Sequence, residues 1–324
     1  MKQAVLVFAI ALVITLAIGP AVINYLRKMK FGQKILEIGP KWHMNKQNIP
    51  TMGGFMFIIG IAAAVIIGNI VMGEISVSSL AVLGLAVAYG AVGLVDDYAK
   101  IKKKENAGLT PKQKLVLQIL VAGVFILVLF LGSSGLPQLW IPFTGISFSW
   151  PWPLYIVFAA FVIVGADNAV NLTDGIDGLA ASVTLPVAIF FVSVGFRRGD
   201  MGVVIFSAAL AGALLGFLRY NFNPAKVFMG DTGSLFLGGA VAGLAFACEM
   251  PLILLLVGLI YIIETLSVIL QVTYFKATHG KRLFKMAPIH HHFEMCGWGE
   301  KRIVLTFTAV TIVLCLAAYF VALP

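Results

Sequence analysis

Charged residues are scarce in this sequence of 324 residues. Asp, Glu, Lys and Arg together make up 11% of the chain, whereas hydrophobic residues make up 60%, and the mean hydropathy is +1.00. A typical water-soluble domain contains about 25% charged residues. The shortage of charge therefore excludes an ordinary soluble domain and predicts an integral membrane protein.

Other absences narrow the class further. The three cysteines, Cys248, Cys296 and Cys315, form no CxxC pair, which argues against a disulfide framework or a zinc site. No GxxxxGK(S/T) motif occurs, so a P-loop that binds ATP is not expected. The alternating strands of an outer-membrane barrel are also missing. Because there is no internal repeat and no long linker, we expect a single domain over residues 1–324.

Long apolar runs are what the sequence has instead. Each is about as long as the roughly 20 residues that a helix needs to cross the hydrocarbon of a bilayer. A helix satisfies its own backbone hydrogen bonds in lipid, so the runs predict an all-α fold, a polytopic transmembrane helical bundle. We expect about ten spans, starting near residues 3, 53, 78, 115, 153, 178, 201, 232, 251 and 302. The first run lacks a small-residue cleavage pattern and is interpreted as an uncleaved signal-anchor.

The net charge of +9 could indicate a nucleic-acid partner, but the positions of the basic residues argue against one. With ten spans, both termini lie on the same side of the membrane. Of the 23 Lys and Arg residues, only Lys2, Arg197 and Arg198 fall on that side. The positive-inside rule then places both termini outside and makes the following loops cytoplasmic: 26–52, 96–114, 171–177, 219–231 and 276–302.

Two adjacent carboxylates, Asp96 and Asp97, end the third expected span, and Lys100 follows them. Carboxylates at membrane depth are costly and are usually present for function. An interfacial cap is the alternative interpretation, but it does not require two neighbouring acids. Such a pair repels unless a cation or a proton is shared between the two groups. The pair therefore indicates a site for a cation, a phosphate, or both.

A second polar segment contains Asn168, Asn171, Asp174 and Asp177. If the segment is helical, the last three, spaced i, i+3, i+6, spread over about a third of the helix circumference. An Asx-rich turn that caps the sixth span is the alternative, because Asn and Asp are favoured N-cap residues. A cap needs only one such residue, so the cluster favours a binding function.

Asp231 opens the eighth expected span, just after Phe228. An N-cap is again the alternative, and it is a strong one for a single aspartate. Hard oxygen ligands at several loop ends suit Mg²⁺, which binds through one or two carboxylates together with substrate phosphates. We therefore expect Asp231 to bind Mg²⁺.

Two further segments contribute candidate residues. Three adjacent histidines, His290, His291 and His292, cannot easily chelate one zinc ion. They are therefore expected to donate hydrogen bonds or to move protons near a phosphate. The alternative is a solvated loop.

In the first loop, Lys46 and Thr51 precede a Gly-Gly helix start, and such a helix N-terminus favours phosphate binding.

Taken together and in this order, the motifs between about residues 41 and 294 resemble the polyprenyl-phosphate N-acetylhexosamine-1-phosphate transferases. They resemble most closely the bacterial members that act on MurNAc-pentapeptide. The resemblance implies transfer of phospho-MurNAc-pentapeptide from UDP-MurNAc-pentapeptide to undecaprenyl phosphate, which gives lipid I and UMP in peptidoglycan biosynthesis. It also implies Mg²⁺ as cofactor, a multi-pass protein in the bacterial cytoplasmic membrane with its active site on the cytoplasmic face, and no nucleic-acid partner.

The resemblance also assigns roles by residue. Asp96 and Asp97 match the catalytic aspartate pair, Asp231 matches the magnesium ligand, and the three histidines match the histidine motif of the catalytic site. The residues that match the substrate and nucleotide pocket are Lys46, Thr51, Lys100, Asn168, Asn171, Asp174, Asp177 and Phe228. The role of each histidine, the choice of base within the aspartate pair, the role of Glu264 and a homodimeric state are left open.

Two other functions were weighed. Transfer of GlcNAc-1-phosphate is disfavoured by the histidine segment, because the relatives that use GlcNAc have a more Arg-rich loop there. An ion-coupled transporter is disfavoured because transporter sites lie near the bilayer midplane, whereas these acids lie at the ends of spans.

Overall fold

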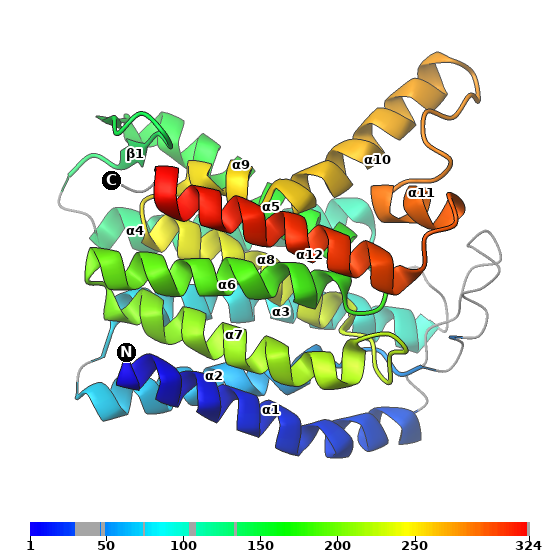
Figure 1. The fold of residues 1–324 in the computed structure, drawn as a ribbon. Helices are drawn as coiled ribbons and strands as arrows, with labels where there is room; N and C mark the ends of the chain where they lie inside the picture. The colour runs from blue at the N-terminus through cyan, green and yellow to red at the C-terminus, as the bar shows by residue number, and fades with distance from the viewer. Residues whose placement is uncertain (30–45, 47–48, 74, 104–107, 133–134, 323–324) are drawn as a thin grey trace.

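The computed structural model describes residues 1–29, 46, 49–73, 75–103, 108–132 and 135–322 (Figure 1). Most of the first cytoplasmic loop that the sequence predicts lies outside these residues. The long helices of the first half are α1 (Lys2–Lys28), α2 (Gly54–Met72), α3 (Val77–Lys103), α4 (Pro111–Gly132) and α5 (Trp152–Thr173). Those of the second half are α6 (Leu179–Arg198), α7 (Met201–Asn221), α8 (Gly230–Ala247), α10 (Leu259–Ala277) and α12 (Glu300–Ala317).

The fold is an all-α membrane bundle, as the sequence predicts. Within the described residues, nine helices are long and apolar enough to cross a membrane, and α8 falls outside that set. Its 18 residues nevertheless rise about 27 Å, close to the thickness of the hydrocarbon. Figure 1 also places the start of α1 and the end of α12 at the same end of the bundle, which requires an even number of crossings. We therefore assign α8 as the tenth crossing.

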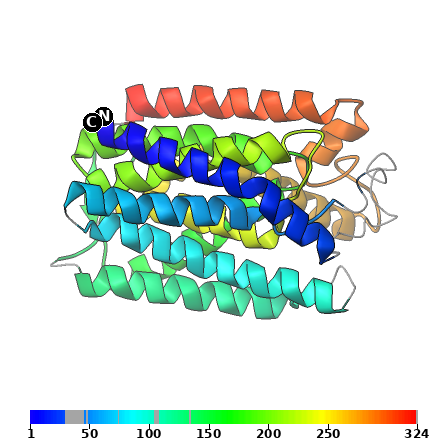
Figure 2. The same cartoon turned by 90° about the horizontal axis from the view of Figure 1, so that it is seen from below.

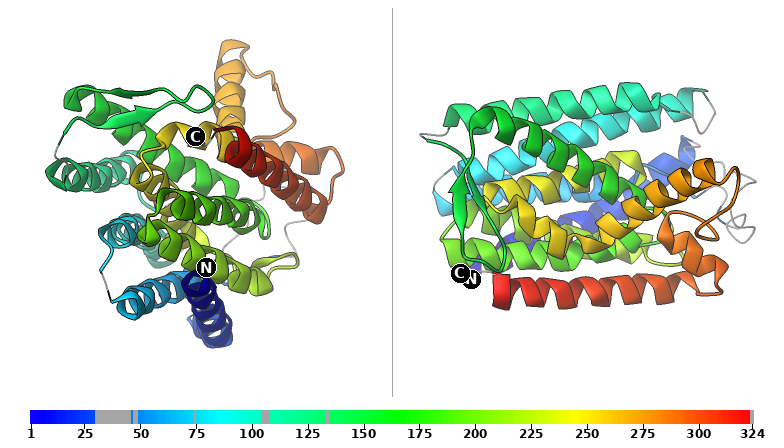
Figure 3. Two further views of the ribbon diagram at one scale, coloured as in Figure 1. Left: turned by 60° about the vertical axis from the view of Figure 1, so that its left-hand side comes forward. Right: turned by 90° about the horizontal axis from the view of Figure 1, so that it is seen from above.

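Helix α8 forms the centre of the molecule. Every residue from Thr232 to Phe246 is buried, and the helix packs most extensively against α3 and also against α5. Figures 2 and 3 show the other long helices arranged around it. A helix enclosed by protein needs little apolarity on a lipid-facing side, which explains its Gly-rich and polar first turns.

The ninth expected span begins later than the sequence suggests. The apolar run starts near residue 251, but a 3-10 turn (Pro251–Ile253) and the short helix α9 (Leu254–Val257) precede α10. Hydropathy does not register the break, because the residues on both sides of Gly258 are equally apolar. Helix α10 then leans away from the bundle, and its residues from Val268 onward are not buried (Figure 3).

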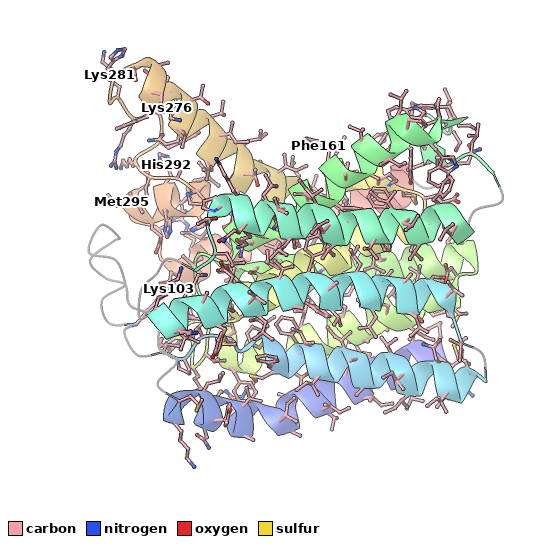
Figure 4. The ribbon with its side chains drawn as sticks, turned by 180° about the vertical axis from the view of Figure 1, so that it is seen from behind. Lys103, Phe161, Lys276, Lys281, His292 and Met295 are labelled. Atoms are coloured by element: carbon pink, nitrogen blue, oxygen red, sulfur yellow. The ribbon has the colours of Figure 1, made fainter. Side chains whose placement is uncertain are left out.

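Three small elements complete the fold. A hairpin that the sequence did not predict joins α4 to α5, with β1 (Gln138–Trp140) antiparallel to β2 (Ser147–Ser149). The short helix α11 (Ile289–Met295) contains the histidine segment, and a π-helical turn, η3 (Ala318–Ala322), follows α12. Figure 4 shows His292 and Met295 on α11 at the same end of the bundle as Lys103 at the end of α3, with Lys276 and Lys281 at the tip of α10.

A glycine fixes the contact between α3 and α8. A Cβ atom on Gly93 would overlap the backbone carbonyl group of Asp231, so the start of α8 rests directly on α3. Small residues allow such close approach of helices in membranes. The same helix offers a contrast at Gly84, where a Cβ atom would meet nothing within 4 Å.

We expect Gly93→Ala to lower the thermal stability of the purified protein, because backbone atoms must move to admit the methyl group. Overpacking of this kind costs about 1–3 kcal/mol. Gly84→Ala is the matched control and should be neutral or slightly stabilising, because alanine favours the helix. Equal melting temperatures for the two variants in detergent would contradict the close contact.

Candidate active site

Three carboxylates meet at one end of the bundle. Asp96 and Asp97 lie in the last turns of α3, and Asp231 lies in the first turn of α8. One oxygen atom from each carboxylate lies within 4.8 Å of the others. The aspartates that the sequence singled out on two distant segments therefore form one cluster, here called the acid triad.

Two lysines offset part of the negative charge of the acid triad. The Nζ atom of Lys100 lies 2.6 Å from Asp96 Oδ2 and 2.9 Å from Asp231 Oδ2. The Nζ atom of Lys114, at the start of α4, lies 2.8 Å from the same Asp231 oxygen. The sequence predicts Lys100 but not Lys114 as a site residue, because nothing distinguishes Lys114 from the other lysines of its loop. The contacts place both ammonium groups among the carboxylates.

Asp97 also holds the N-terminus of α8. Its Oδ2 accepts hydrogen bonds from the backbone N–H of Thr232 (2.8 Å) and from the hydroxyl of Thr232 (2.7 Å). Its Oδ1 accepts from the backbone N–H of Asp231 at 3.2 Å. Free N–H groups and the helix dipole both favour a carboxylate at this place. Asp97 thus caps α8 from α3, a role that the alternative interpretation of the sequence gave to Asp231.

Asn171 and Asp174 lie on the α5 side of the cluster. Asn171 donates to Asp231 Oδ1 at 3.1 Å and to the hydroxyl of Ser234 at 2.7 Å. Helix α5 ends at Thr173, so Asn171, Asp174 and Asp177 do not share a helical face, contrary to the helical interpretation of their spacing. The half-buried carboxyl of Asp174 makes no side-chain hydrogen bond to another described residue. Burial raises the pKa of Asp174, and the negative charge of Asp231 raises it further.

Asp177 belongs to a separate group. Its Oδ1 lies 2.6 Å from the Nζ atom of Lys46, and its Oδ2 accepts hydrogen bonds from Asn223 (3.2 Å) and from the backbone N–H of Ala225 (2.9 Å). The ammonium of Lys46 also lies 2.7 Å from a carboxylate oxygen of Glu300, which the sequence analysis did not identify. The structure therefore brings Lys46 and Asp177, two residues predicted for the nucleotide pocket, into direct contact.

The side chain of Asn168 bonds to α4 and not to the acid triad. Its amide donates to Gln118 Oε1 on α4 at 3.0 Å, and Gln118 in turn donates to the buried carboxylate of Asp167 at 2.7 Å. No hydrogen bond joins Asn168 to the acid triad among the described residues. Its contacts connect α4 with α5, so the structure does not bring this predicted residue to the cluster.

Each of the first two histidines is paired with a glutamate. The Nδ1 atom of His290 lies 3.0 Å from Glu264 Oε2, and both side chains are fully buried. The Nδ1 atom of His291 lies 2.6 Å from Glu294 Oε2. A carboxylate at Nδ1 fixes the orientation of an imidazole and leaves Nε2 as its second functional atom. The first of these contacts assigns a role to Glu264, which lies on α10 and orients the imidazole ring of His290.

His292 makes contacts of a different kind. Its Nδ1 accepts the backbone N–H of Lys285 at 3.1 Å, and its ring packs against Phe284. His292 therefore contacts the loop before α11. The first histidine instead faces the α5–α6 turn, since a Cβ atom on Gly175 would overlap the ring of His290.

Thr51 and Phe228 flank the acid triad. Residue Gly230 has φ of +71° and packs so closely that a Cβ atom would lie 2.8 Å from Thr51 Oγ1 and 2.6 Å from Asp97 Oδ2. The backbone of Phe228 pairs with the strand-like segment before α2, donating to Pro50 and accepting from Gly53. Phe228 is half-buried, so part of the residue is accessible.

The donor set of the acid triad fits a divalent cation. Carboxylate oxygens are the ligands that Mg²⁺ prefers, and three of them lie within reach of one ion. The neighbouring Lys100 and Lys114 fit anionic groups such as phosphates. The arrangement can therefore bind a metal together with a phosphorylated ligand.

We expect opposite effects on stability from two Asp→Asn variants measured in the presence of a chelator. Asp97→Asn turns an N–H group toward the donors of α8 and should lower the melting temperature, because hydrogen bonds to charged groups contribute about 1.5–3 kcal/mol each. Asp174→Asn should raise it at neutral pH. A carboxyl whose pKa is raised by folding destabilises the folded state above its unfolded pKa of about 3.9. The gain from Asp174→Asn should therefore disappear as the pH falls below that value; a gain that persists there would contradict the assignment.

Known proteins are similar to this chain over almost its whole length. Residues 79–249 match the sequence model of glycosyl transferase family 4. The phospho-N-acetylmuramoyl-pentapeptide-transferase of Clostridium perfringens (strain 13 / Type A) is 48% identical over 319 residues, which cover 97% of each chain. The enzymes of the same name from Listeria monocytogenes serotype 4b (strain CLIP80459) and Bacillus licheniformis are 45% and 44% identical, and cover 94% and 99% of both chains. The chain therefore belongs to the phospho-N-acetylmuramoyl-pentapeptide-transferase family, within glycosyl transferase family 4.

Proposed function

We propose that this protein transfers phospho-MurNAc-pentapeptide from UDP-MurNAc-pentapeptide to undecaprenyl phosphate in the bacterial cytoplasmic membrane. The products are lipid I and UMP. The observation that carries the proposal is the acid triad with its two lysines, set at the end of a membrane bundle in a chain that is similar over its full length to enzymes of this name. These names favour MurNAc-pentapeptide over GlcNAc as the group transferred.

The location of the acid triad at one end of the bundle suits a reaction between a soluble donor and a lipid acceptor. The donor is a soluble nucleotide sugar and the acceptor is a lipid, so the reaction needs a polar site at a membrane surface. The acid triad lies where α3 ends and α8 begins, at the end of the bundle opposite the termini (Figure 1). We assign this end to the cytoplasmic side, because the loops there are rich in lysine and arginine.

The residues at the site supply positioning and charge neutralisation, which provide most of the catalysis in phosphoryl transfer. Asp231, with Asp96 and Asp97 beside it, would hold Mg²⁺, which would neutralise charge on the donor pyrophosphate. Lys100 and Lys114 reach the same place and would bind phosphate oxygens. On the nucleotide side, Phe228 offers a face for stacking, and Lys46, Thr51, Asn171, Asp174 and Asp177 provide polar groups.

Asp96 is the better candidate for the base that acts on the acceptor. Both oxygens of Asp97 are occupied by donors from the first turn of α8. The Oδ2 atom of Asp96 instead pairs with the side chain of Lys100, which can move to a substrate phosphate. We infer that Asp96 removes a remaining proton from the lipid phosphate, an oxygen of which attacks the β-phosphorus of the donor while UMP leaves. A positioned base contributes about 10²–10⁴-fold to such a rate.

The substrate assignment is tested with purified protein, a polyprenyl phosphate and Mg²⁺. We expect UMP release with UDP-MurNAc-pentapeptide and little or none with UDP-GlcNAc, measured by chromatography of the nucleotide products. Lipid-linked MurNAc-pentapeptide should appear in equal amount. UMP release with UDP-GlcNAc only would contradict the proposal and favour the GlcNAc alternative.

The metal assignment is tested at Asp231. We expect Asp231→Asn to lower UMP release by about a hundredfold or more, because an electrostatic group aimed at the reacting charge is lost. Chelation should abolish wild-type activity, and added Mg²⁺ should restore it. Mn²⁺ binding followed by electron paramagnetic resonance should weaken in the variant. A folded Asp231→Asn protein with normal activity and unchanged Mg²⁺ dependence would refute the assignment.

Direct attack by the acceptor is tested by stereochemistry. A phosphate monoester has a second pKa of about 6, so the acceptor is already mostly dianionic at neutral pH. Because a dianionic oxygen can attack the donor directly, the reaction needs no covalent enzyme intermediate. With a donor made chiral at the β-phosphorus, we expect inversion at that centre, as one in-line displacement requires. Retention would show two displacements and a covalent intermediate, and would leave the substrate assignment intact.

A further inference from the structure

Glu300 joins three separate segments that carry residues of the proposed nucleotide pocket. It is the first residue of α12, and its side chain is 11% exposed. One carboxylate oxygen lies 2.7 Å from the Nζ atom of Lys46, and Oε2 accepts hydrogen bonds from Asn223 Nδ2 at 3.1 Å and from the backbone N–H of Asp177 at 3.3 Å. These partners come from the segment before α2, the connection between α7 and α8, and the turn between α5 and α6.

Glu300 is one of two carboxylates that hold the ammonium group of Lys46. The side chain of Lys46 is only 15% exposed, and its ammonium group lies between two carboxylates, those of Asp177 and Glu300, at 2.6 and 2.7 Å. A lysine side chain has many rotamers, and two short ion pairs fix one of them. The position of Glu300 in the first turn of α12 is itself favourable for a negative charge, because of the helix dipole.

Each segment that Glu300 joins carries an expected nucleotide residue. Lys46 and Thr51 belong to the first, Asp174 and Asp177 to the second, and Phe228 follows Asn223 on the third. Residues before α2 and around Phe228 are also paired through their backbones. Loss of the shared carboxylate would thus leave Lys46 with one ion pair instead of two and Asn223 Nδ2 with one acceptor instead of two, and it would remove the acceptor of the Asp177 N–H.

We propose that Glu300 is a positioning residue for the uridine nucleotide of the donor: it holds Lys46 and the three pocket segments in the arrangement that binds the nucleotide. The inference rests on the proposed function and adds to it a residue outside the predicted motifs. Glu300 acts through Lys46, Asp177 and Asn223, and the acid triad does not depend on it. Its removal therefore impairs binding of the donor and spares the chemical step and the lipid acceptor.

Two substitutions at Glu300 distinguish the effects of its charge and position from the effect of side-chain packing alone. Glu300→Gln keeps the size of the side chain but replaces an acceptor by an N–H group and removes the ion pair with Lys46. Glu300→Asp keeps the charge on a shorter stem. Glu249→Gln is the matched control, because Glu249 is an exposed glutamate at the other end of α8. Phe228→Ala provides a variant with an expected defect in the same pocket.

The experiment measures UMP affinity by calorimetry, together with kcat, both KM values and the melting temperature, on the full-length protein in detergent. We expect Glu300→Gln to weaken UMP binding by about 10- to 100-fold, as loss of a charged hydrogen-bond partner does. The KM for UDP-MurNAc-pentapeptide should rise in parallel, while kcat and the KM for polyprenyl phosphate stay close to the wild-type values. Glu300→Asp should recover part of the affinity, and Glu249→Gln should match the wild type.

Two results would overturn the inference alone. The first is wild-type UMP affinity in Glu300→Gln. The second is a fall in melting temperature with kcat and both KM values impaired together and no recovery in Glu300→Asp, which would make Glu300 a structural residue of α12. A wild-type protein that neither binds UMP nor releases it would overturn the proposed function and this inference with it.

Discussion

The structure depends on the placement of three aspartates beside the N-terminus of one central helix. Carboxylates so close together repel, and burial at a membrane boundary strengthens the repulsion. Lys100 and Lys114 offset that charge, and the N–H groups of α8 bind Asp97. The close contact at Gly93 brings α3 near enough for this arrangement. A cluster that needs positive charge to be stable is suited to bind a cation and to act on phosphates.

Much of this could be predicted from the sequence, for identifiable reasons. Long apolar runs determine helices in lipid, because no other structure satisfies the backbone there. The acids stand out because charged residues are rare in such a chain, so Asp96, Asp97 and Asp231 were found without any knowledge of their distance in space. Hydropathy alone does not locate the break before α10, because Pro251 and Gly258 interrupt the helix without interrupting the apolar run.

The partners of the predicted residues could not be found in the same way. Lys114 and Glu300 are ordinary in sequence, and the sequence leaves the role of Glu264 open. All three gain their roles from contacts that helix packing creates; Glu300 lies 254 residues from Lys46. Spacing was also misleading where the backbone changes, since α5 ends before Asp174 and Asp177 leaves the helical face of Asn171. Motifs thus located the site, whereas its charge balance required the three-dimensional fold.

The central claim is that the acid triad is the metal site of a phosphotransferase. The most direct measurement is anomalous diffraction from crystals of the protein grown with Mn²⁺ and UMP. We expect one strong anomalous peak among the carboxylates of Asp96, Asp97 and Asp231, with the nucleotide beside Phe228. A metal peak elsewhere in the molecule, with none at the acid triad in protein that is active with Mn²⁺, would contradict it.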